Sequence, residues 1–228
     1  MNDDIKKIRE IVKNVHGWLG RGEGEFLYKA AKKCKGNGVI LEIGSWKGRS
    51  TIWLGQGSKS GNGVKIYAVD PHTGSQEHNI MFGKVNTFDE FKKNIKLAGV
   101  DNIVIPIKST SEEAFKKWGG KQIELLWIDG DHKYNSVILD YLLWGPLLIE
   151  NGIIAFHDTL KGDVVKVVKK YLYKGDHFAN VGFIGGTTYG RKVKKLNLIG
   201  KFRNIFIYML RLFFIFFHEL TVKLKIHN

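Results

Sequence analysis

Two patterns of apolar and polar residues alternate along most of the chain: short continuous apolar runs and stretches with helical periodicity. Short continuous apolar runs, typical of fully buried parallel strands, occupy residues 39–44, 64–70, 102–109, 123–129 and 152–158. Helical periodicity occupies residues 3–16, 25–35, 88–98, 112–118, 136–150 and 163–173, and also begins at residue 49. Residues 178–193, with Gly-Gly at 185–186, are typical of an antiparallel hairpin. This order predicts an α/β fold: a Rossmann-like, doubly wound, mainly parallel sheet with N-terminal helices and a C-terminal antiparallel hairpin.

Two prolines refine the predicted elements. Pro106 lies inside the third apolar run, which indicates an edge strand or a strand end, because proline cannot donate to a hydrogen-bonded ladder. Gly145-Pro146 indicates a kink or an end within the helix predicted over 136–150. Asn151-Gly152 predicts a turn before the fifth strand.

The C-terminal segment, residues 203–226, departs from the alternating pattern. As a helix, its most apolar part, residues 205–217, would span about 20 Å, short of the roughly 30 Å of a bilayer core. A single membrane span is therefore not expected. Asn204, Arg211 and His218 recur every seven residues and leave a narrow polar stripe beside a very wide apolar surface. This pattern is typical of a helix in a membrane interface, in a homodimer or other partner interface, or packed on its own domain, and the three alternatives stay open.

The net charge of +14 invites a nucleic-acid interpretation, but its distribution weakens it. Residues 191–228 carry nine Lys and Arg and one acid, which leaves only +6 for residues 1–190. We therefore expect three parts: an N-terminal helix (1–20), a main domain (21–195) and a basic, apolar C-terminal helix (196–228). The lone Cys34 and a charged N-terminus fit a reducing, cytoplasmic location, with the basic tail suited to the inner face of a membrane.

Polar groups follow the predicted strands at their carboxyl ends, where doubly wound sheets bind ligands. After the first strand, LEIGSWKGRS (41–50) places Gly44 and Gly48 in a turn that opens a helix, and Asp70 ends the second strand. A glycine turn lets a ligand approach the backbone, and a second-strand acid suits ribose hydroxyls, so the pair predicts an adenosine-containing cofactor. The G-x-x-x-G spacing fits NAD poorly, which ranks oxidoreductase chemistry last.

The pattern E-x-G-x-x-x-G with Asp70, WIDGDH (127–132) and GIIAFHDT (152–159) resembles class I S-adenosylmethionine-dependent methyltransferases. Within that class, residues 20–192 are similar to catechol, caffeoyl-CoA, sugar and antibiotic O-methyltransferases. The resemblance implies O-methylation of a small hydroxylated acceptor, such as a sugar or, given the tail, a lipid-linked glycan. Predicted S-adenosylmethionine contacts are Glu42, Gly44, Ser45, Gly48, Ser50, Asp70, Pro71, His72, Lys108, Ser109, Thr110 and Asp129.

The same resemblance implies a divalent metal held by Asp129, His157 and Asp158. Where the family usually has Asp-Asn or Glu-Asp after the fifth strand, this chain has His157-Asp158. An imidazole favours Mn, Zn, Fe or Ni over Mg. His132 is the predicted general base, with Asp129 beside it as a catalytic metal ligand and Asp131 as a turn or cap residue. Alternatively, His132 is a solvated turn residue and His157 caps its strand.

The long polar segment 71–88 is predicted to form a lid over the ligand end of the sheet, where His72 and His78 would meet the acceptor. Two other functions stay open. One is a catalytically silent cofactor-binding adaptor at a membrane or partner surface, and the other, ranked lower, is a nucleic-acid methyltransferase.

Overall fold

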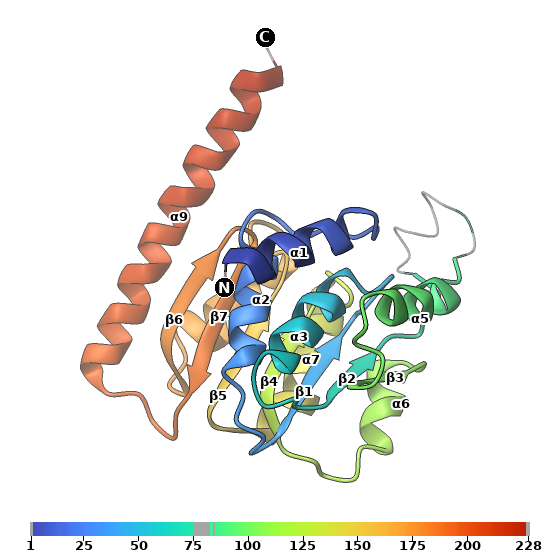
Figure 1. Cartoon of the computed structure of the whole chain (residues 1–228). Helices are drawn as coiled ribbons and strands as arrows, with labels where there is room; N and C mark the ends of the chain where they lie inside the picture. Colours follow the sequence, from blue (N-terminus) through green and yellow to red (C-terminus); the bar gives the residue numbers. More distant parts are fainter. Residues whose placement is uncertain (1, 75–82, 84, 227–228) are drawn as a thin grey trace.

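The described chain, residues 2–74, 83 and 85–226 of the computed structural model, folds around one sheet of seven strands (Figure 1). The strands are β1 (Val39–Ile43), β2 (Ile66–Val69), β3 (Val104–Ile107), β4 (Ile123–Ile128), β5 (Leu148–Phe156), β6 (Phe178–Ile184) and β7 (Thr187–Lys192). Their spatial order is β3-β2-β1-β4-β5-β7-β6. Strands β1 to β5 run parallel, and β7 is antiparallel to both of its neighbours. The predicted mainly parallel α/β sheet with a C-terminal hairpin is therefore confirmed.

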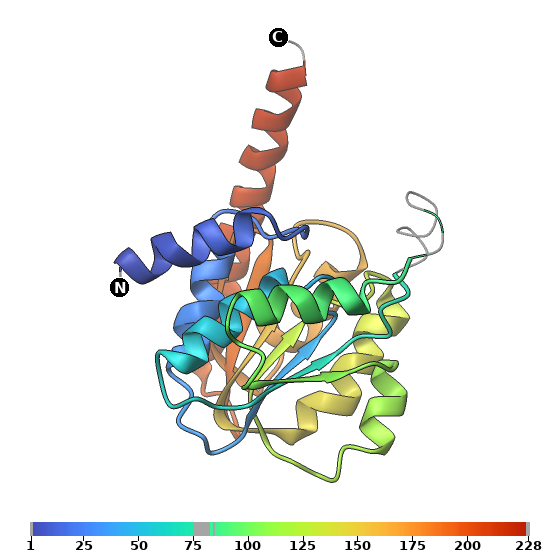
Figure 2. The ribbon, with the colours of Figure 1, turned by 45° about the vertical axis from the view of Figure 1, so that its right-hand side comes forward.

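Helices cover both faces of this sheet (Figures 1 and 2). One face carries α1 (Asn2–Lys13), α2 (Glu23–Lys32), α3 (Arg49–Lys59) and α5 (Phe88–Leu97). The other carries α6 (Ser111–Lys116), α7 (Tyr134–Trp144), and α8 (Asp163–Val168) with its π-helical continuation η2 (Lys169–Tyr173). Because both faces are covered, the central strands are buried on both sides, which explains why they read as continuous apolar runs.

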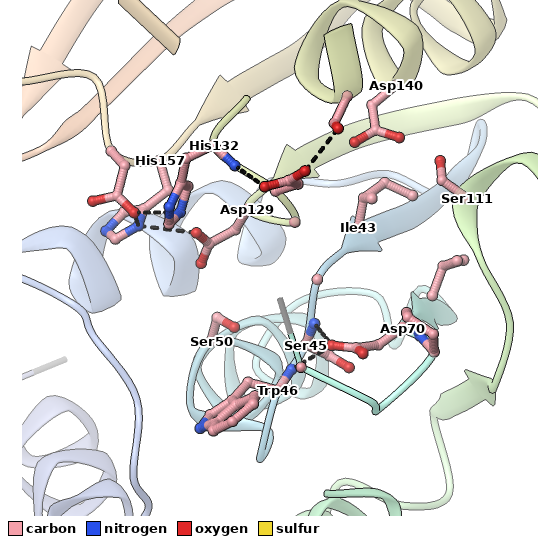
Figure 3. Close-up of a pocket in the computed structure, with 18 of the residues that line it drawn as sticks. Ile43, Ser45, Trp46, Ser50, Asp70, Ser111, Asp129, His132, Asp140 and His157 are labelled. Carbon is pink, nitrogen blue, oxygen red and sulfur yellow. Dashed lines mark hydrogen bonds and ion pairs between the residues drawn. The ribbon is translucent and has the colours of Figure 1, made fainter. Parts of the chain in front are cut away.

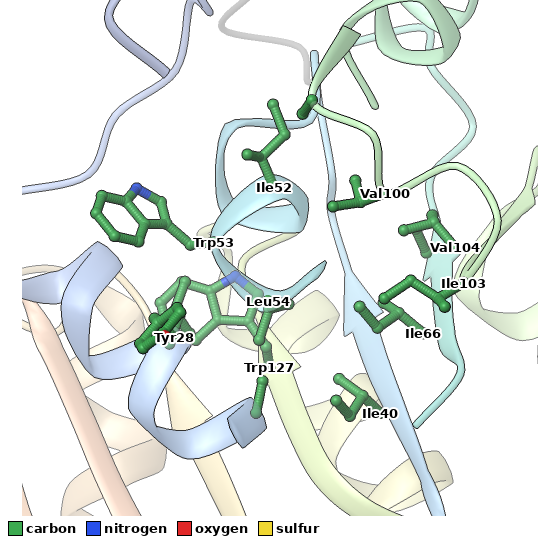
Figure 4. Close-up of a cluster of buried hydrophobic side chains, with 14 of the residues drawn as sticks. Tyr28, Ile40, Ile52, Trp53, Leu54, Ile66, Val100, Ile103, Val104 and Trp127 are labelled. Carbon is green, nitrogen blue, oxygen red and sulfur yellow. The ribbon is translucent and has the colours of Figure 1, made fainter. Parts of the chain in front are cut away.

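Two hydrophobic clusters fill the space between the sheet and its helices. Successive residues of a strand point to opposite faces, so Ile40 joins the first cluster and Leu41 the second. Figure 4 shows part of the first cluster, to which β4 contributes Trp127, α2 contributes Tyr28 and α3 contributes Leu54. The apolar positions of α1 belong to the same cluster, so the N-terminal helix is packed on the main body.

The prediction of one helix over residues 136–150 is wrong at its C-terminal end. Helix α7 ends at Trp144, a 3₁₀ turn (η1, Gly145–Leu147) follows, and β5 already begins at Leu148. The physical reason is Pro146, which lacks an amide donor and cannot continue the helix. The predicted turn at Asn151-Gly152 is a bulge inside β5, because the register jumps from Ile123↔Leu148 to Leu125↔Ile153.

The other elements of the main body lie within a few residues of their predicted bounds. Strand β3, which contains Pro106, is at the edge of the sheet, as that proline predicts. Strands β6 and β7 form the hairpin predicted over 178–193.

The chain continues into one long helix, α9 (Leu198–Ile226), which begins two residues after the start of the C-terminal helix predicted over 196–228. It packs against β6 and η2 and then runs on past the carboxyl ends of the strands (Figures 1 and 2). In the part of the chain that the structure describes, no helix combines the length and apolar character that a membrane crossing requires.

Candidate active site

A cavity of about 850 Å³ opens at the carboxyl ends of β1, β2, β4 and β5 (Figure 3). Its floor comes from these strand ends, and its rim from the segment 16–19 and the start of α6. Parallel strands with a crossover on either side of β1 leave a crevice at this edge, which is where such sheets bind ligands.

The turn after β1 brings the backbone of two strands into close contact. Gly44 has φ +84°, and a Cβ added there would lie 2.2 Å from the carbonyl oxygen of Asp129. Only glycine tolerates both the left-handed backbone and this approach. Gly48, with φ +92°, is the N-cap of α3, and that helix begins at Arg49. The turn therefore presents the N-terminus of α3 and the end of β4 to the same cavity.

Asp70 fixes this turn from the end of β2. Its Oδ2 accepts hydrogen bonds from the amides of Ser45 (2.8 Å) and Trp46 (2.7 Å), and its Oδ1 accepts one from the amide of His72 (2.6 Å). Ser45 and Ser50 line the cavity, and the buried Oγ of Ser45 has no hydrogen-bond partner among the described residues. A buried hydroxyl in that position is an available contact for a ligand.

Strained backbone gathers at the same edge. Of the non-glycine residues with positive φ, Trp46 (48°), His72 (59°) and Asp158 (53°) each lie within three residues of the end of β1, β2 or β5. Left-handed conformations of such residues cost free energy and cluster at functional sites.

Glu42 lies behind the turn and does not line the cavity. Its side chain is fully buried between β1 and α3, and Oε2 accepts a hydrogen bond from Thr51 Oγ1 at 2.5 Å. Burial raises the pKa of Glu42 to about 8, and the nearby carboxylates of Asp129 and Asp70 push it in the same direction. At neutral pH this side chain is mostly uncharged, so an ionic contact to the ammonium group of S-adenosylmethionine requires that Glu42 first loses its proton.

The WIDGDH stretch forms a tight turn after β4. The amide of His132 donates to Asp131 Oδ1 at 2.8 Å, and Ser136 Oγ donates to Asp131 Oδ2 at 2.7 Å. Asp131 therefore holds the turn, as predicted from the sequence. The imidazole of His132 reaches the end of the neighbouring strand, where Nε2 lies 2.9 Å from Asp158 Oδ2.

His157 is enclosed by carboxylates. Its Nε2 lies 3.1 Å from Glu23 Oε2, while its Nδ1 lies 3.0 Å from Asp129 Oδ1 and 3.2 Å from Asp158 Oδ2. Burial alone would lower the pKa of His157, but Asp129, Asp158 and Glu23 together raise it well above its usual value. The buried imidazole is therefore an imidazolium at neutral pH, with a carboxylate at each ring nitrogen.

The pKa values of the three carboxyl groups around His157 are shifted in different directions. Burial works to raise the pKa of Asp158, but hydrogen bonds from His132 and His157 hold it well below its usual value. Burial also opposes ionisation of Glu23, whose pKa is nevertheless lowered by His157 and by the amides of Gly20 and Gly186. For Asp129, burial dominates and raises the pKa.

The divalent metal implied by the resemblance has a donor set here, although its composition differs from the prediction. Asp129, His132 and Asp158 each offer one ligand atom, and these atoms lie within 4.8 Å of one another. Two carboxylates and one imidazole suit a first-row divalent ion such as Mn²⁺. His157, the predicted third ligand, is not part of this group and has a carboxylate oxygen within 3.2 Å of each ring nitrogen. The group of close ligand atoms thus contains His132, and ligation by His157 stays a prediction.

The predicted cofactor contacts divide into two groups. Those that line the cavity are Gly44, Ser45, Ser50, Asp70, Pro71, Thr110 and Asp129, together with the predicted catalytic and metal residues His132, His157 and Asp158. Those that do not line it are Glu42, Gly48, His72, Lys108 and Ser109. His78, predicted to meet the acceptor, lies outside the described residues.

Two of the residues outside the lining have structural contacts of their own. His72 is buried, and its Nδ1 lies 2.9 Å from Thr87 Oγ1. The ammonium of Lys108 lies over the ring of Phe88, at 5.0 Å from its centroid.

The N-terminal segment forms a wall of the cavity that sequence reasoning missed. Arg49 Nη1 donates to the carbonyl oxygens of Val15 and Gly17, both at 3.2 Å, which ties this segment to the start of α3. The tie places His16 and Trp18 beside Trp46, with Trp46 Nε1 donating to His16 Nδ1 at 3.1 Å. Ring centroids of Trp18 and Trp46 are 5.8 Å apart. The only sequence signal was a histidine and a tryptophan in a glycine-rich break.

The cavity is acidic although the chain is basic. Among the described residues that line it, the acids are Asp70, Glu112, Asp129, Asp131, Asp140 and Asp158. Arg49 is the sole Lys or Arg in that lining. Asp140 shows the effect of this crowding: burial raises its pKa to about 6, and nearby acids add to the shift. A ligand with positive charge would relieve this repulsion.

The sheet order, the glycine turn after β1 and the acids at the ends of β2 and β4 define a Rossmann-like methyltransferase fold. Residues 41–159, about half of the chain, match the family described as Methyltransferase domain. The chain therefore belongs to this methyltransferase family.

One relative and two solved structures show the breadth of the similarity. The uncharacterized protein R132 of Acanthamoeba polyphaga mimivirus is 31% identical over 123 residues, which are 53% of this chain and 51% of that protein. The chain thus spans about half the length of this relative. The O-methyltransferase NovP superposes with a TM-score of 0.64 at 15% identity, covering 79% of this chain and 84% of NovP. The SAH-bound methyltransferase PaMTH1 of Podospora anserina superposes with a TM-score of 0.61 at 17% identity, covering 85% and 89%.

Proposed function

We propose that the protein is an S-adenosylmethionine-dependent O-methyltransferase that methylates a hydroxyl group of a small molecule, a sugar or a glycan. The observation that carries this proposal is the acidic cavity in which the glycine turn, Asp70 and the pair His132–Asp158 meet. Family membership and the solved O-methyltransferase NovP support the same chemistry.

The cofactor half of the cavity suits a ligand with cationic groups. S-adenosylmethionine supplies an electrophilic methyl group on a sulfonium, and its amino-acid end carries an ammonium. The carboxylates of Asp70 and Asp129 complement these positive charges. The N-terminus of α3 and the buried hydroxyl of Ser45 offer donors for the carboxylate of the same ligand.

The acceptor half contains a base that is already oriented. His132 donates from Nε2 to Asp158, which leaves the basic lone pair of the imidazole on Nδ1. In the proposed reaction this imidazole takes the proton of the acceptor hydroxyl while the oxygen forms a bond to the methyl carbon. The bond from that carbon to sulfur breaks, and its electron pair stays on sulfur. The His132 side chain is 42% exposed, so its proton then passes to solvent.

A divalent ion would be held by Asp129, His132 and Asp158, and it would lower the pKa of a bound hydroxyl. As a metal ligand, His132 does not act as the base. Metal dependence of turnover therefore separates the two roles.

The aromatic wall supports a ring-shaped acceptor. Trp18 is half exposed at the rim, and Trp46 lies beside it on the same wall. Flat aromatic faces of this kind pack against the apolar faces of sugar rings or against aromatic rings. The acidic lining also argues against a nucleic-acid substrate, whose phosphates would be repelled.

The proposal is tested by methyl transfer from labelled S-adenosylmethionine to a panel of hydroxylated sugars and phenols, with and without Mn²⁺ or Mg²⁺. We expect turnover by the wild type, and a loss in kcat of roughly 10²–10⁴-fold in His132→Gln. His177→Gln, a histidine outside the cavity lining, serves as the matched control and should keep the wild-type rate.

Cofactor binding without transfer to any acceptor of this panel would contradict the proposed O-methyltransferase activity. It would support instead a cofactor-binding adaptor. Turnover that is equal in His132→Gln and wild type would exclude the assigned base.

A further inference from the structure

Helix α9 is oriented with its polar side chains inward. Asn204 is fully buried, and its Nδ2 donates to the carbonyl of Phe178 at 2.7 Å. Arg211 is 2% exposed; its Nη1 donates to the carbonyl of Gly185 at 2.6 Å, and its Nη2 donates to Thr159 Oγ1 at 2.9 Å. The stripe of polar residues predicted from the sequence thus docks onto the protein's own domain. The side chain of His218, its third predicted member, is not described.

The opposite side of α9 is apolar and exposed. Six large exposed residues on that side form what we call the outer face: Phe202, Phe206, Met209, Phe213, Phe216 and Phe217. Each is between 53% and 74% exposed. At about 100° per residue, these six positions share one side of the helix. Such a contiguous apolar surface on a soluble domain marks an interaction site.

Charge distinguishes a lipid surface from a second copy of the chain. Lys194 and Lys195 lie just before α9, Lys201 and Arg203 lie in its first turns, and Lys223 and Lys225 lie near its end. The helix contains a single acid, Glu219. Two copies packed through α9 would bring basic ends together in either the parallel or the antiparallel orientation. Anionic headgroups, in contrast, complement both ends.

The width of the apolar surface also favours a lipid surface over a second copy of the chain. Leu198, Ile199, Ile205, Leu210, Leu212 and Phe214 are also at least 39% exposed and flank the outer face. Together, these positions cover roughly 200° of the helix circumference at about 100° per residue. A two-helix interface uses a much narrower seam, whereas a helix in a lipid interface immerses a broad face.

We propose that α9 docks the protein on an anionic lipid surface, with the outer face immersed at the boundary between headgroups and acyl chains. The helix runs along β6 and projects past the carboxyl ends of the strands (Figures 1 and 2). The residues that line the cavity lie at the carboxyl ends of β1, β2, β4 and β5. Arg211 ties α9 to Thr159, the residue after Asp158. Docking through α9 therefore fixes the β6 edge of the sheet at the lipid surface. This inference does not rest on the proposed methyl transfer.

The test is co-flotation of the full chain with vesicles of phosphatidylcholine and phosphatidylglycerol, compared with vesicles of phosphatidylcholine alone. We expect binding to the anionic vesicles and at least tenfold weaker binding to the neutral ones. Replacing two outer-face residues, Phe206→Gln/Phe213→Gln, should weaken binding to anionic vesicles more than tenfold. Leu97→Gln/Leu142→Gln is the matched control, because both leucines are exposed on other helices, and it should bind as the wild type does.

A second variant tests the contribution of positive charge to lipid binding. Lys194→Gln/Lys195→Gln should weaken binding to anionic vesicles by roughly fivefold for each charge removed, and added salt should reduce that difference. Thermal unfolding of each variant confirms that it is folded, independently of any activity.

Three results would overturn the proposal. The first is no binding to either vesicle, and the second is equal binding to neutral and anionic vesicles. The third is a concentration-dependent dimer in sedimentation equilibrium that the Phe206→Gln/Phe213→Gln variant dissolves while vesicle binding is absent, which would assign the outer face to a second copy of the chain.

Discussion

Glu42 shows how burial and neighbouring carboxylates determine the state of one residue. Its pKa of about 8 exceeds the ordinary value of 4.5, so the folded protein favours its protonated form. The contribution of Glu42 to stability is therefore fully present below pH 4.5 and is lost as the pH rises through about 8.

The variant Glu42→Gln removes this dependence, because an amide resembles the protonated acid and does not titrate. We expect wild type and variant to have similar free energies of unfolding at pH 5. Between pH 5 and 8 the wild type should lose up to about 1.4 kcal/mol per pH unit relative to the variant. Urea unfolding across this range measures the difference. Parallel stability curves for the two proteins would contradict the assigned pKa.

Glu23 and His157 form a buried ion pair that links α2 to the end of β5. Replacing Glu23 by Gln leaves the imidazolium with less compensating charge and weakens two backbone hydrogen bonds. We expect a loss of roughly 3–5 kcal/mol in the free energy of unfolding. Glu25→Gln, in the same helix but paired with Arg9 at the surface, should cost about 1 kcal/mol or less. Equal effects of the two substitutions in urea unfolding would exclude the buried pair.

The sequence identified the residues at the strand ends but not their partners. Asp70, Asp129 and His132 could be found because each follows an apolar run, and strand ends share one edge of a sheet. Glu23 could not be found in this way, because its partner His157 lies 134 positions further along the chain and its local context is a glycine-rich break. His157 is a further example: its position beside Asp158 is readable from the sequence, but its contact with the distant carboxylate of Glu23 is not, and its role as a metal ligand stays a prediction.

At the scale of elements, the turn between β1 and α3 is the most constrained connection in the site. Gly44→Ala would combine a left-handed backbone with an overlap between Cβ and the Asp129 carbonyl. We expect a loss of roughly 2–5 kcal/mol in stability, together with weaker cofactor binding as the turn moves.

Gly36→Ala is the matched control for this substitution. Gly36 also has a positive φ, of +88°, but nothing lies within 4 Å of an added Cβ. Its cost should stay near 1–2 kcal/mol, the strain alone. Chemical denaturation of both variants separates the cost of the overlap from the cost of the backbone strain. Equal losses in the free energy of unfolding would show that the close approach to Asp129 does not affect stability.

Element predictions succeeded where hydrophobic period and turn chemistry agreed. The buried strands, the hairpin and the edge position of Pro106 were all predictable, since each follows from a local pattern. The start of β5 was not, because the apolar residues after Pro146 fit the core face of a helix as well as a strand. Pairing of Leu148 with Ile123 decides between them, and that contact is tertiary.

For the whole molecule, the main contrast is between a strongly basic chain and an acidic cavity. Composition alone suggests an anionic partner, whereas the cavity selects for positive charge. The two tendencies are separated in space, because the excess of basic residues is concentrated around α9 and the acids at the strand ends. Docking to anionic lipid and binding of a cationic cofactor are therefore compatible in one chain.

The most direct test of the account is calorimetric titration of the full chain with S-adenosylmethionine. We predict binding at a single site, weakened at least tenfold, or by about 1.4 kcal/mol, in Asp70→Asn. Asp101→Asn, at an exposed position away from the cavity, should bind as the wild type does. A folded chain that binds neither S-adenosylmethionine nor its demethylated product would contradict the account, and would leave only the fold in common with methyltransferases.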